Sequence, residues 1–266
     1  MKKEIREVMY DFIQVMKVLK RRRVDIHQYG KVVMLLLPLL KIKEGYELDF
    51  YQLGDNMGSR YEPYVCKAGA TEPYIPTVYV DGTPVDFEER HAIHLDLFGD
   101  DKEKEPKKIH IPYDESKRVV DMLDFRENDD IPQALPYFEV PFTEDGIMQA
   151  WLLDKITLFL PLFWHCLYNK KFFILNNDNI DWGFAESSKD EELKNVKNII
   201  TAMDRELLYP IIKIDGDEAL LTLTYWNAWR GLVKECIKAR RNGTCIVFDE
   251  KVERTVLVPY ESGLRF

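Results

Sequence analysis

The chain lacks the short motifs that identify many enzyme classes. Its 266 residues contain no nucleophile elbow, phosphate-binding loop, dinucleotide fingerprint or zinc-knuckle spacing. Each of these motifs uses a fixed spacing to hold a nucleophile, a phosphate group or a metal ion. Their absence leaves the sequence without a specific indication of catalysis, so function has to be argued from weaker patterns.

Cysteine is also scarce. The four cysteines, Cys66, Cys166, Cys236 and Cys245, are irregularly spaced and have apolar neighbours. This pattern is typical of reduced thiols that pack as small hydrophobic side chains. The opening residues, MKKEIREVMYDF, include acidic side chains and lack the apolar core of a signal peptide. We therefore expect a cytoplasmic protein.

Positive charge is in deficit. Lysine and arginine total 37 against 46 aspartates and glutamates, which gives a formal charge of -9 at pH 7. Binding to phosphates of nucleic acid needs a positive surface, so we do not expect nucleic acid as a principal partner. An acidic surface suits solubility or a basic protein partner.

Apolar runs long enough to cross a membrane are absent as well. The most apolar stretch, residues 156–168, reads ITLFLPLFWHCLY and is shorter than the roughly 20 residues that cross a bilayer. It has no acidic or basic side chain apart from one histidine, so the sequence favours a buried central helix. We expect this helix to start at Thr143, to bend or break at Pro161, and to end near Tyr168. Residues 172–175 then predict a short strand that is covered on both faces.

The remaining patterns predict a mixed α+β protein, an α/β architecture in which helices pack on a mixed sheet. Apolar residues at helical spacing indicate a leading amphipathic helix over residues 2–21. The apolar run 32–40 fits either a short helix or a strand, and we favour the helix. Residues 113–126 show helical spacing again and predict another helix. Between these helices we expect a β-rich region with strands at residues 46–53, 60–66, 76–80, 83–87, 91–98 and 107–113.

A polar, acidic segment with Pro132 and Pro136, residues 126–136, is the best candidate for a boundary within the chain. We therefore expect a leading helix and β-rich region over residues 1–130 and an alternating α/β region over residues 131–266. A single compact domain that shares one sheet is the alternative. The second region predicts a hairpin at Asp215-Gly216, strands at 137–140, 211–214, 245–248 and 252–258, and helices from residue 190 and over 225–241.

One group of side chains has the composition of a metal site. If strands 91–98 and 107–113 pair with Phe98 opposite Lys108, then Asp96 lies opposite His110, and His94 shares their face. Two imidazoles and a carboxylate are the ligands of many divalent metal sites, including hydrolytic zinc centres. The alternative is an ordinary solvent-facing side of the hairpin, because a shift of one residue in the pairing separates the three side chains.

These patterns favour an acidic protein-interaction protein without catalytic activity and without a cofactor, which binds or neutralises a basic protein partner. Aromatic side chains are plentiful and could anchor such an interface. The expected contact surface combines Asp129 and Asp130 with the nearby Tyr113 and Tyr137, and a solvated acidic linker is the alternative for this segment. The alternative function is a metal-dependent hydrolase that uses His94, Asp96 and His110.

Overall fold

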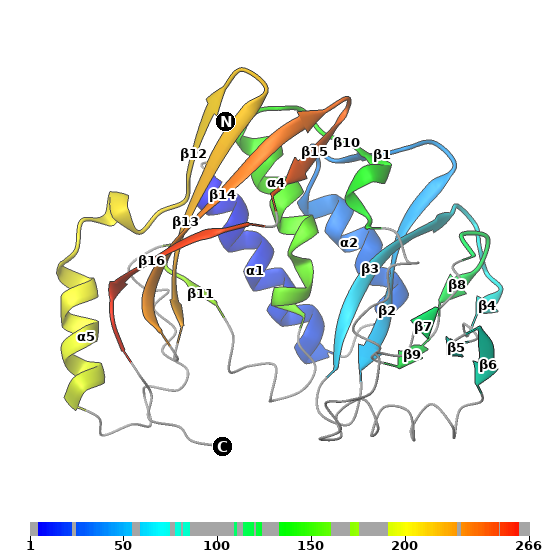
Figure 1. The fold of residues 1–266 in the computed structure, drawn as a ribbon, viewed down its shortest axis with the longest axis horizontal. Helices are drawn as coiled ribbons and strands as arrows, with labels where there is room; N and C mark the ends of the chain where they lie inside the picture. The colour runs from blue at the N-terminus through cyan, green and yellow to red at the C-terminus, as the bar shows by residue number, and fades with distance from the viewer. Residues whose placement is uncertain are drawn as a thin grey trace.

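The computed structural model of the chain shows the expected mixed α+β fold (Figure 1). Helices occupy the middle of the molecule, with one β-rich region on either side of them. The structure describes residues 5–22, 25–54, 59–74, 78–80, 82–85, 109–110, 114–119, 121–123, 133–160, 171–175, 191–227, 230–249 and 251–260.

The leading helix, α1 (Ile5–Arg22), is confirmed, and its apolar stripe is buried as predicted. Met9, Phe12 and Met16 have no exposed surface, because their spacing of three or four residues places them on one helical face. A short 3-10 helix, η1 (Ile26–Gln28), leads into α2 (Tyr29–Leu36), so the ambiguous run 32–40 is helical over its first half.

The first β-rich region is built on a long hairpin of β2 (Tyr46–Gly54) and β3 (Ser59–Lys67), as the sequence predicts. Two-residue strands β1 (Lys41–Ile42) and β10 (Phe138–Glu139) pair beside it. The expected strands at 76–80, 83–87 and 107–113 are present in their described parts. They are β5 (Val78–Val80), β6 (Thr83–Val85) and β7 (Ile109–His110), which form one small sheet.

The predicted helix over residues 113–126 is wrong. This segment contains β8 (Arg118–Val119), which pairs with β4 (Pro73–Tyr74), and β9 (Asp121–Leu123), which runs parallel to the end of β2. Asp114 accepts hydrogen bonds from the backbone N–H and the hydroxyl of Ser116 within a turn. The pairing of this segment with β4 and β2 outweighs its helical spacing, because helix propensity is a weak preference in so short a segment.

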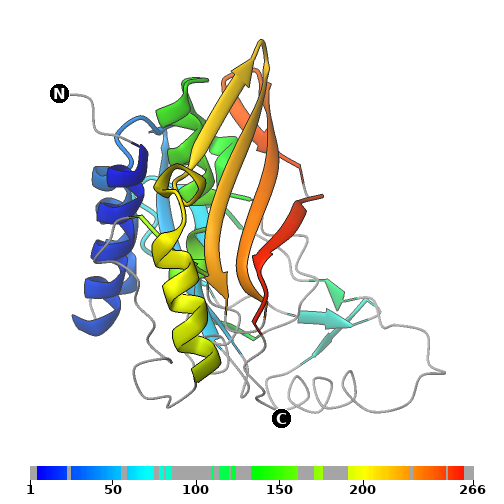
Figure 2. The same cartoon turned by 90° about the vertical axis from the view of Figure 1, so that its left-hand side faces the viewer.

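The central helix, α4 (Glu144–Asp154), starts as predicted, with the Thr143 hydroxyl accepting from the backbone N–H of Gly146. Every residue from 146 to 153 is buried, since α4 lies between α1 and the six-stranded sheet that is described next (Figure 2). The prediction that it continues to Tyr168 is wrong, because the chain changes to a 3-10 helix, η3 (Ile156–Phe159). Pro161 disfavours helical backbone only at the preceding Leu160, so it does not account for the end of α4 at Asp154, and residues 161–168 lie outside the described residues.

The second β-rich region is a six-stranded antiparallel sheet. The expected hairpin at Asp215-Gly216 is confirmed, and Gly216 has a φ of 58°. The face of this sheet that includes Leu221, Leu223 and Ile237 joins the main hydrophobic core and is called the inner face below. The strands are β11 (Phe172–Phe173), β12 (Ile211–Asp215), β13 (Glu218–Asn227), β14 (Gly231–Asn242), β15 (Cys245–Phe248) and β16 (Glu253–Val258).

The predicted helix over residues 225–241 is wrong, because these residues belong to β13 and β14. Burial in β14 alternates toward its end, which is the period of a strand. Asn242-Gly243 does not end a helix but turns the chain between β14 and β15, with Gly243 at a φ of 60°. The strands of the second region form an antiparallel sheet with helices packed on it.

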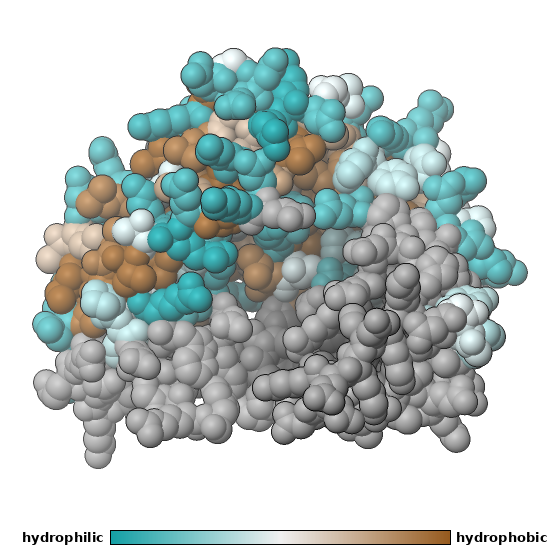
Figure 3. Space-filling view, in the orientation of Figure 1, coloured by the Kyte–Doolittle hydropathy of each residue, from teal (hydrophilic) through white to brown (hydrophobic). Residues whose placement is uncertain are grey.

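The expected helix near residue 190 is present as α5 (Glu191–Ala202). It buries Val196 and Ile200 against Trp226 and Leu232 of the large sheet in a second, smaller cluster. Apolar and hydrophilic side chains mix on the surface over α5 and β16, in the left part of Figure 3. The main core takes side chains from both sides of the predicted boundary, while the division at residue 130 stays a prediction. None of the helices in the described ranges is both long enough and apolar enough to cross a membrane.

Candidate functional site

The structure places only part of the predicted metal site. His110 lies on β7, opposite Tyr79 of β5, while His94 and Asp96 lie outside the described residues. The described portion of the chain contains no group of three or more His, Cys, Asp or Glu side chains placed to hold a metal ion. The set of His94, Asp96 and His110 therefore stays a prediction.

Of the predicted partner-binding residues, Asp129, Asp130 and Tyr113 also lie outside the described residues. Tyr137 ends the 3-10 helix η2 (Leu135–Tyr137), and its ring centroid lies 5.0 Å from that of Tyr46. Burial, with smaller contributions from Glu115 and Tyr46, raises the pKa of Tyr137. Tyr137 is thus part of an aromatic pair at the start of β2.

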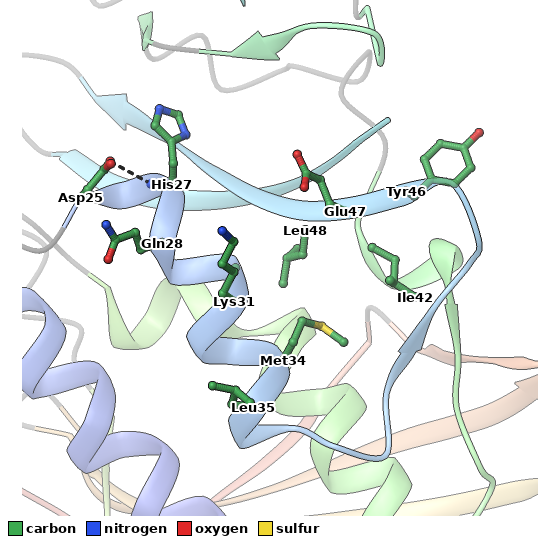
Figure 4. Close-up of a pocket in the computed structure, with 11 residues that line it drawn as sticks. Asp25, His27, Gln28, Lys31, Met34, Leu35, Ile42, Tyr46, Glu47 and Leu48 are labelled. Carbon is green, nitrogen blue, oxygen red and sulfur yellow. Dashed lines mark hydrogen bonds between the residues drawn. The ribbon is translucent and has the colours of Figure 1, made fainter. Parts of the chain in front are cut away.

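Tyr46 belongs to a groove between α2 and β2 that the sequence did not reveal (Figure 4). The groove has a volume of about 650 Å³ and is open to solvent along one side. Its wall combines one face of η1 and α2 with β1 and the start of β2. The lining residues are Asp25, His27, Gln28, Gly30, Lys31, Met34, Leu35, Ile42, Tyr46, Glu47 and Leu48.

Gly30 sets how closely the two walls approach. A Cβ atom at this position would overlap the carbonyl oxygen of Leu48, so a larger residue would force α2 away from β2. The neighbouring Tyr29 fixes the other side of α2 in the core through edge-on contacts with Phe50 and Tyr61. Burial, and to a smaller extent Tyr61, raises the pKa of Tyr29 to about 12. The floor of the groove is therefore rigidly packed.

One end of the groove holds a histidine and a buried carboxylate. The Nδ1 atom of His27 lies 3.0 and 3.1 Å from the two carboxylate oxygens of Asp49. Asp49 is almost fully buried, and it also accepts from the backbone N–H of Phe50 at 2.8 Å and from the hydroxyl of Tyr64 at 3.2 Å. The His27 side chain is 28% exposed. A carboxylate that fixes one ring nitrogen leaves the other able to bind a ligand or exchange a proton.

The other end of the groove is apolar. Leu35 is 80% exposed, which is unusual for a leucine on a helix that otherwise packs against the core. Met34 from α2 and Leu48 from β2 extend into the space between the two elements, and Ile42 closes its far side (Figure 4). This end can cover an apolar side chain of a ligand.

Charged groups lie between the two ends. Asp25 and Glu47 contribute two carboxylates to the lining, and Lys31 contributes one ammonium group. Figure 4 shows the Lys31 and Glu47 side chains on facing walls, with Asp25 beside His27. The backbone N–H of His27 donates to Asp25 at 3.2 Å, which holds that carboxylate at the rim. The groove can therefore bind a ligand that has both a cationic group and an apolar group.

Sequence reasoning missed this site because its parts are far apart in the chain. His27 and Asp49 are 22 residues apart, and only the packing of η1 on β2 brings them together. One local signal was present: Asp49 stands between Leu48 and Phe50 in a predicted strand, where a buried charge requires a partner. Comparisons with protein-family models, with curated proteins and with solved structures find no match to this chain.

Proposed function

We propose that this protein is a cytoplasmic, non-catalytic interaction protein that binds a segment of a partner protein in the groove between α2 and β2. The observation that carries the proposal is the division of this groove into an apolar end with the exposed Leu35 and a charged part with Asp25 and Glu47. Peptide-binding grooves use this combination, since apolar contacts supply affinity while charged groups select the partner.

Charge complementarity selects the occupant. The lining has two carboxylates against one ammonium group, and the whole chain has a formal charge of -9. Both favour a segment that carries a lysine or arginine next to a large apolar residue. Complementary charge of this kind mainly increases the rate of encounter, and burial of the apolar residue slows dissociation.

The acidic segment with Asp129 and Asp130 is proposed as a second contact for the same basic partner. The support is indirect: Tyr137, which follows this segment, packs on Tyr46 of the groove. Replacing both aspartates by lysine is expected to slow association at low salt and to have less effect at high salt, because exposed charges are screened.

A direct test measures the binding of short synthetic peptides by fluorescence anisotropy. A peptide with arginines beside leucines is expected to bind at least about tenfold more tightly than one with glutamates in place of the arginines, a difference of about 1.4 kcal/mol. Leu35→Asp should weaken binding of the arginine peptide by a similar factor, because it places a charge in the apolar end.

Leu207→Asp is the matched control. Leu207 is also an exposed leucine, at 56%, but it lies in η5 (Arg205–Leu207), which does not line the groove. Equal affinity for the two peptides, or equal affinity of wild type and Leu35→Asp for the arginine peptide, would show that the groove is not the binding site.

A metal-dependent hydrolase that uses His94, Asp96 and His110 is the second proposal. In the described part of its sheet β7 is an edge strand, so its outer side can take the predicted strand 91–98. If the site exists, purified protein should contain zinc or manganese, and replacing either histidine should remove the metal and its effect on thermal stability. Elemental analysis that finds no bound metal after dialysis against zinc would contradict it.

A further inference from the structure

A buried carboxylate on the inner face of the six-stranded sheet holds two cations. Glu235 of β14 is 3% exposed and lies directly across from Arg254 of β16. The ammonium group of Lys171, just before β11, lies 2.9 and 2.8 Å from the two Glu235 oxygens. The Nε–H of Arg254 donates to Oε2 of Glu235 at 3.0 Å. The cluster therefore has two cationic groups against one carboxylate.

Tyr225 of β13 completes the cluster. Its hydroxyl donates to Oε2 of Glu235 at 2.9 Å, and the Lys171 ammonium lies 4.6 Å from the centre of its ring. Burial raises the pKa of the Glu235 carboxyl, but hydrogen bonds from Lys171, Arg254 and Tyr225 outweigh burial and lower it overall. Glu235 is consequently held as a carboxylate that fixes both cations.

Among the described residues, one carboxylate faces two cationic groups in this cluster. Burial lowers the pKa of Lys171, and the positive charges of Arg254 and Lys155 act in the same direction, against the effect of Glu235. Repulsion between like charges in a partly buried place costs free energy, and a bound anion would relieve it.

Arg254 has the geometry to receive such an anion. Its side chain is 45% exposed, although its Nε is fixed by a carboxylate that is only 4% exposed. A guanidinium has five N–H donors; the hydrogen bond to Glu235 uses the one at Nε, and Arg254 also forms a side-chain hydrogen bond with Tyr225. A planar guanidinium fixed in this way matches the two oxygens of a carboxylate or phosphate group with little further loss of entropy.

We propose that Arg254 and Lys171 form a binding site for an oxyanion, which is either a carboxylate or a phosphate group. Arg254 contacts the anion through its exposed guanidinium, and Lys171 supplies the second charge. This site lies on the large sheet and shares no residue with the groove between α2 and β2, so the two proposals can fail separately.

Isothermal titration calorimetry and thermal unfolding with inorganic phosphate and with acetate test the proposal, at an ionic strength held constant with chloride. At least one of the two anions should bind wild type and raise its melting temperature more than chloride does. The anion that binds more tightly identifies the source of the oxyanion. In Arg254→Gln the dissociation constant should rise at least about tenfold.

Arg240→Gln is the matched control. Arg240, on β14 of the same sheet, also pairs with a carboxylate, that of Asp249 at 2.7 Å, and its side chain is 58% exposed. Its replacement should leave anion binding unchanged. If Arg254→Gln fails to fold, anion binding is measured with Arg254→Lys instead. This variant keeps the positive charge but loses the planar guanidinium that can donate two hydrogen bonds to one oxyanion. Weaker binding to that variant supports the proposal. The proposal is overturned if neither anion binds wild type, or if binding survives unchanged in the Arg254 variants.

Discussion

Two buried carboxylates, Asp49 in the first β-rich region and Glu235 in the second, are stabilised in different ways. Asp49 accepts hydrogen bonds from the Phe50 backbone and the Tyr64 hydroxyl, and the Nδ1 atom of His27 lies 3.0 Å from its carboxylate. Glu235 has one neutral donor, Tyr225, and two cationic partners, Lys171 and Arg254. Among these contacts, neutral donors predominate at Asp49 and cationic donors at Glu235.

The difference determines what each region can do. Asp49 holds His27 at one end of the groove between α2 and β2, and the groove lining also contains the carboxylates of Asp25 and Glu47, so it is suited to bind cationic groups. A carboxylate that is overcompensated by two cations leaves a positive region within an acidic protein, which is suited to bind anions. The two proposed sites therefore prefer ligands of opposite charge, and each is built around one buried carboxylate, Asp49 or Glu235.

The largest effect is expected for Glu235→Ala. Removing the carboxylate leaves Lys171 and Arg254 close together without their shared partner, and breaking a buried ion pair in this way costs about 3 to 5 kcal/mol. Urea unfolding of the variant should show this loss in the free energy of unfolding. Glu218→Ala, at an exposed position on β13, is the control and should stay within about 0.5 kcal/mol of wild type.

A smaller effect is expected for Asp49→Asn. The amide keeps the shape and one acceptor oxygen, but it loses the charge that strengthens the hydrogen bonds from Phe50, Tyr64 and His27. Hydrogen bonds to a charged group contribute about 1.5 to 3 kcal/mol, so the loss should fall in this range. The exposed Asp215→Asn is the control. If Asp49→Asn costs as much as Glu235→Ala, the contrast between neutral and cationic donors is wrong.

Sequence patterns predicted the parts of the fold that depend on local periodicity. The apolar stripe of α1 and the Asp215-Gly216 turn follow from neighbouring residues alone, and both are present. The prediction for residues 225–241 was wrong because their apolar side chains fit helical spacing as well as strand spacing. Strand pairing decides between the two, since β13, β15 and β16 pair with β14 on both sides.

Neither candidate site could be read from the sequence, because both depend on contacts between distant residues. Lys171 and Glu235 are 64 residues apart, and nothing local marks them as a pair. The described part of the apolar stretch 156–168 agrees with the expected burial: Ile156 and Leu160 are fully buried and residues 157–159 are half-buried, while residues 161–168 lie outside the described residues. Composition thus predicted where the core lies, whereas the charged clusters required the tertiary fold.

The smallest effect concerns pH, and it sharpens the contrast at Glu235. Its folded-state pKa is lower than the ordinary value of 4.5 despite burial, because Lys171, Arg254 and Tyr225 donate to the carboxylate. A lowered carboxyl pKa stabilises the folded state above pH 4.5, and this contribution is lost as the pH falls through the folded-state pKa.

Glu235→Gln removes the titrating group but keeps an acceptor for the same donors. The variant should be less stable than wild type at neutral pH, and the difference between the two should shrink as the pH is lowered below 4.5. Urea unfolding at a series of pH values between neutrality and acid measures this convergence. A difference that stays constant across the series would mean that the two cations stabilise Glu235 no better in its charged form than in its neutral form, which contradicts the charge-based account of this cluster.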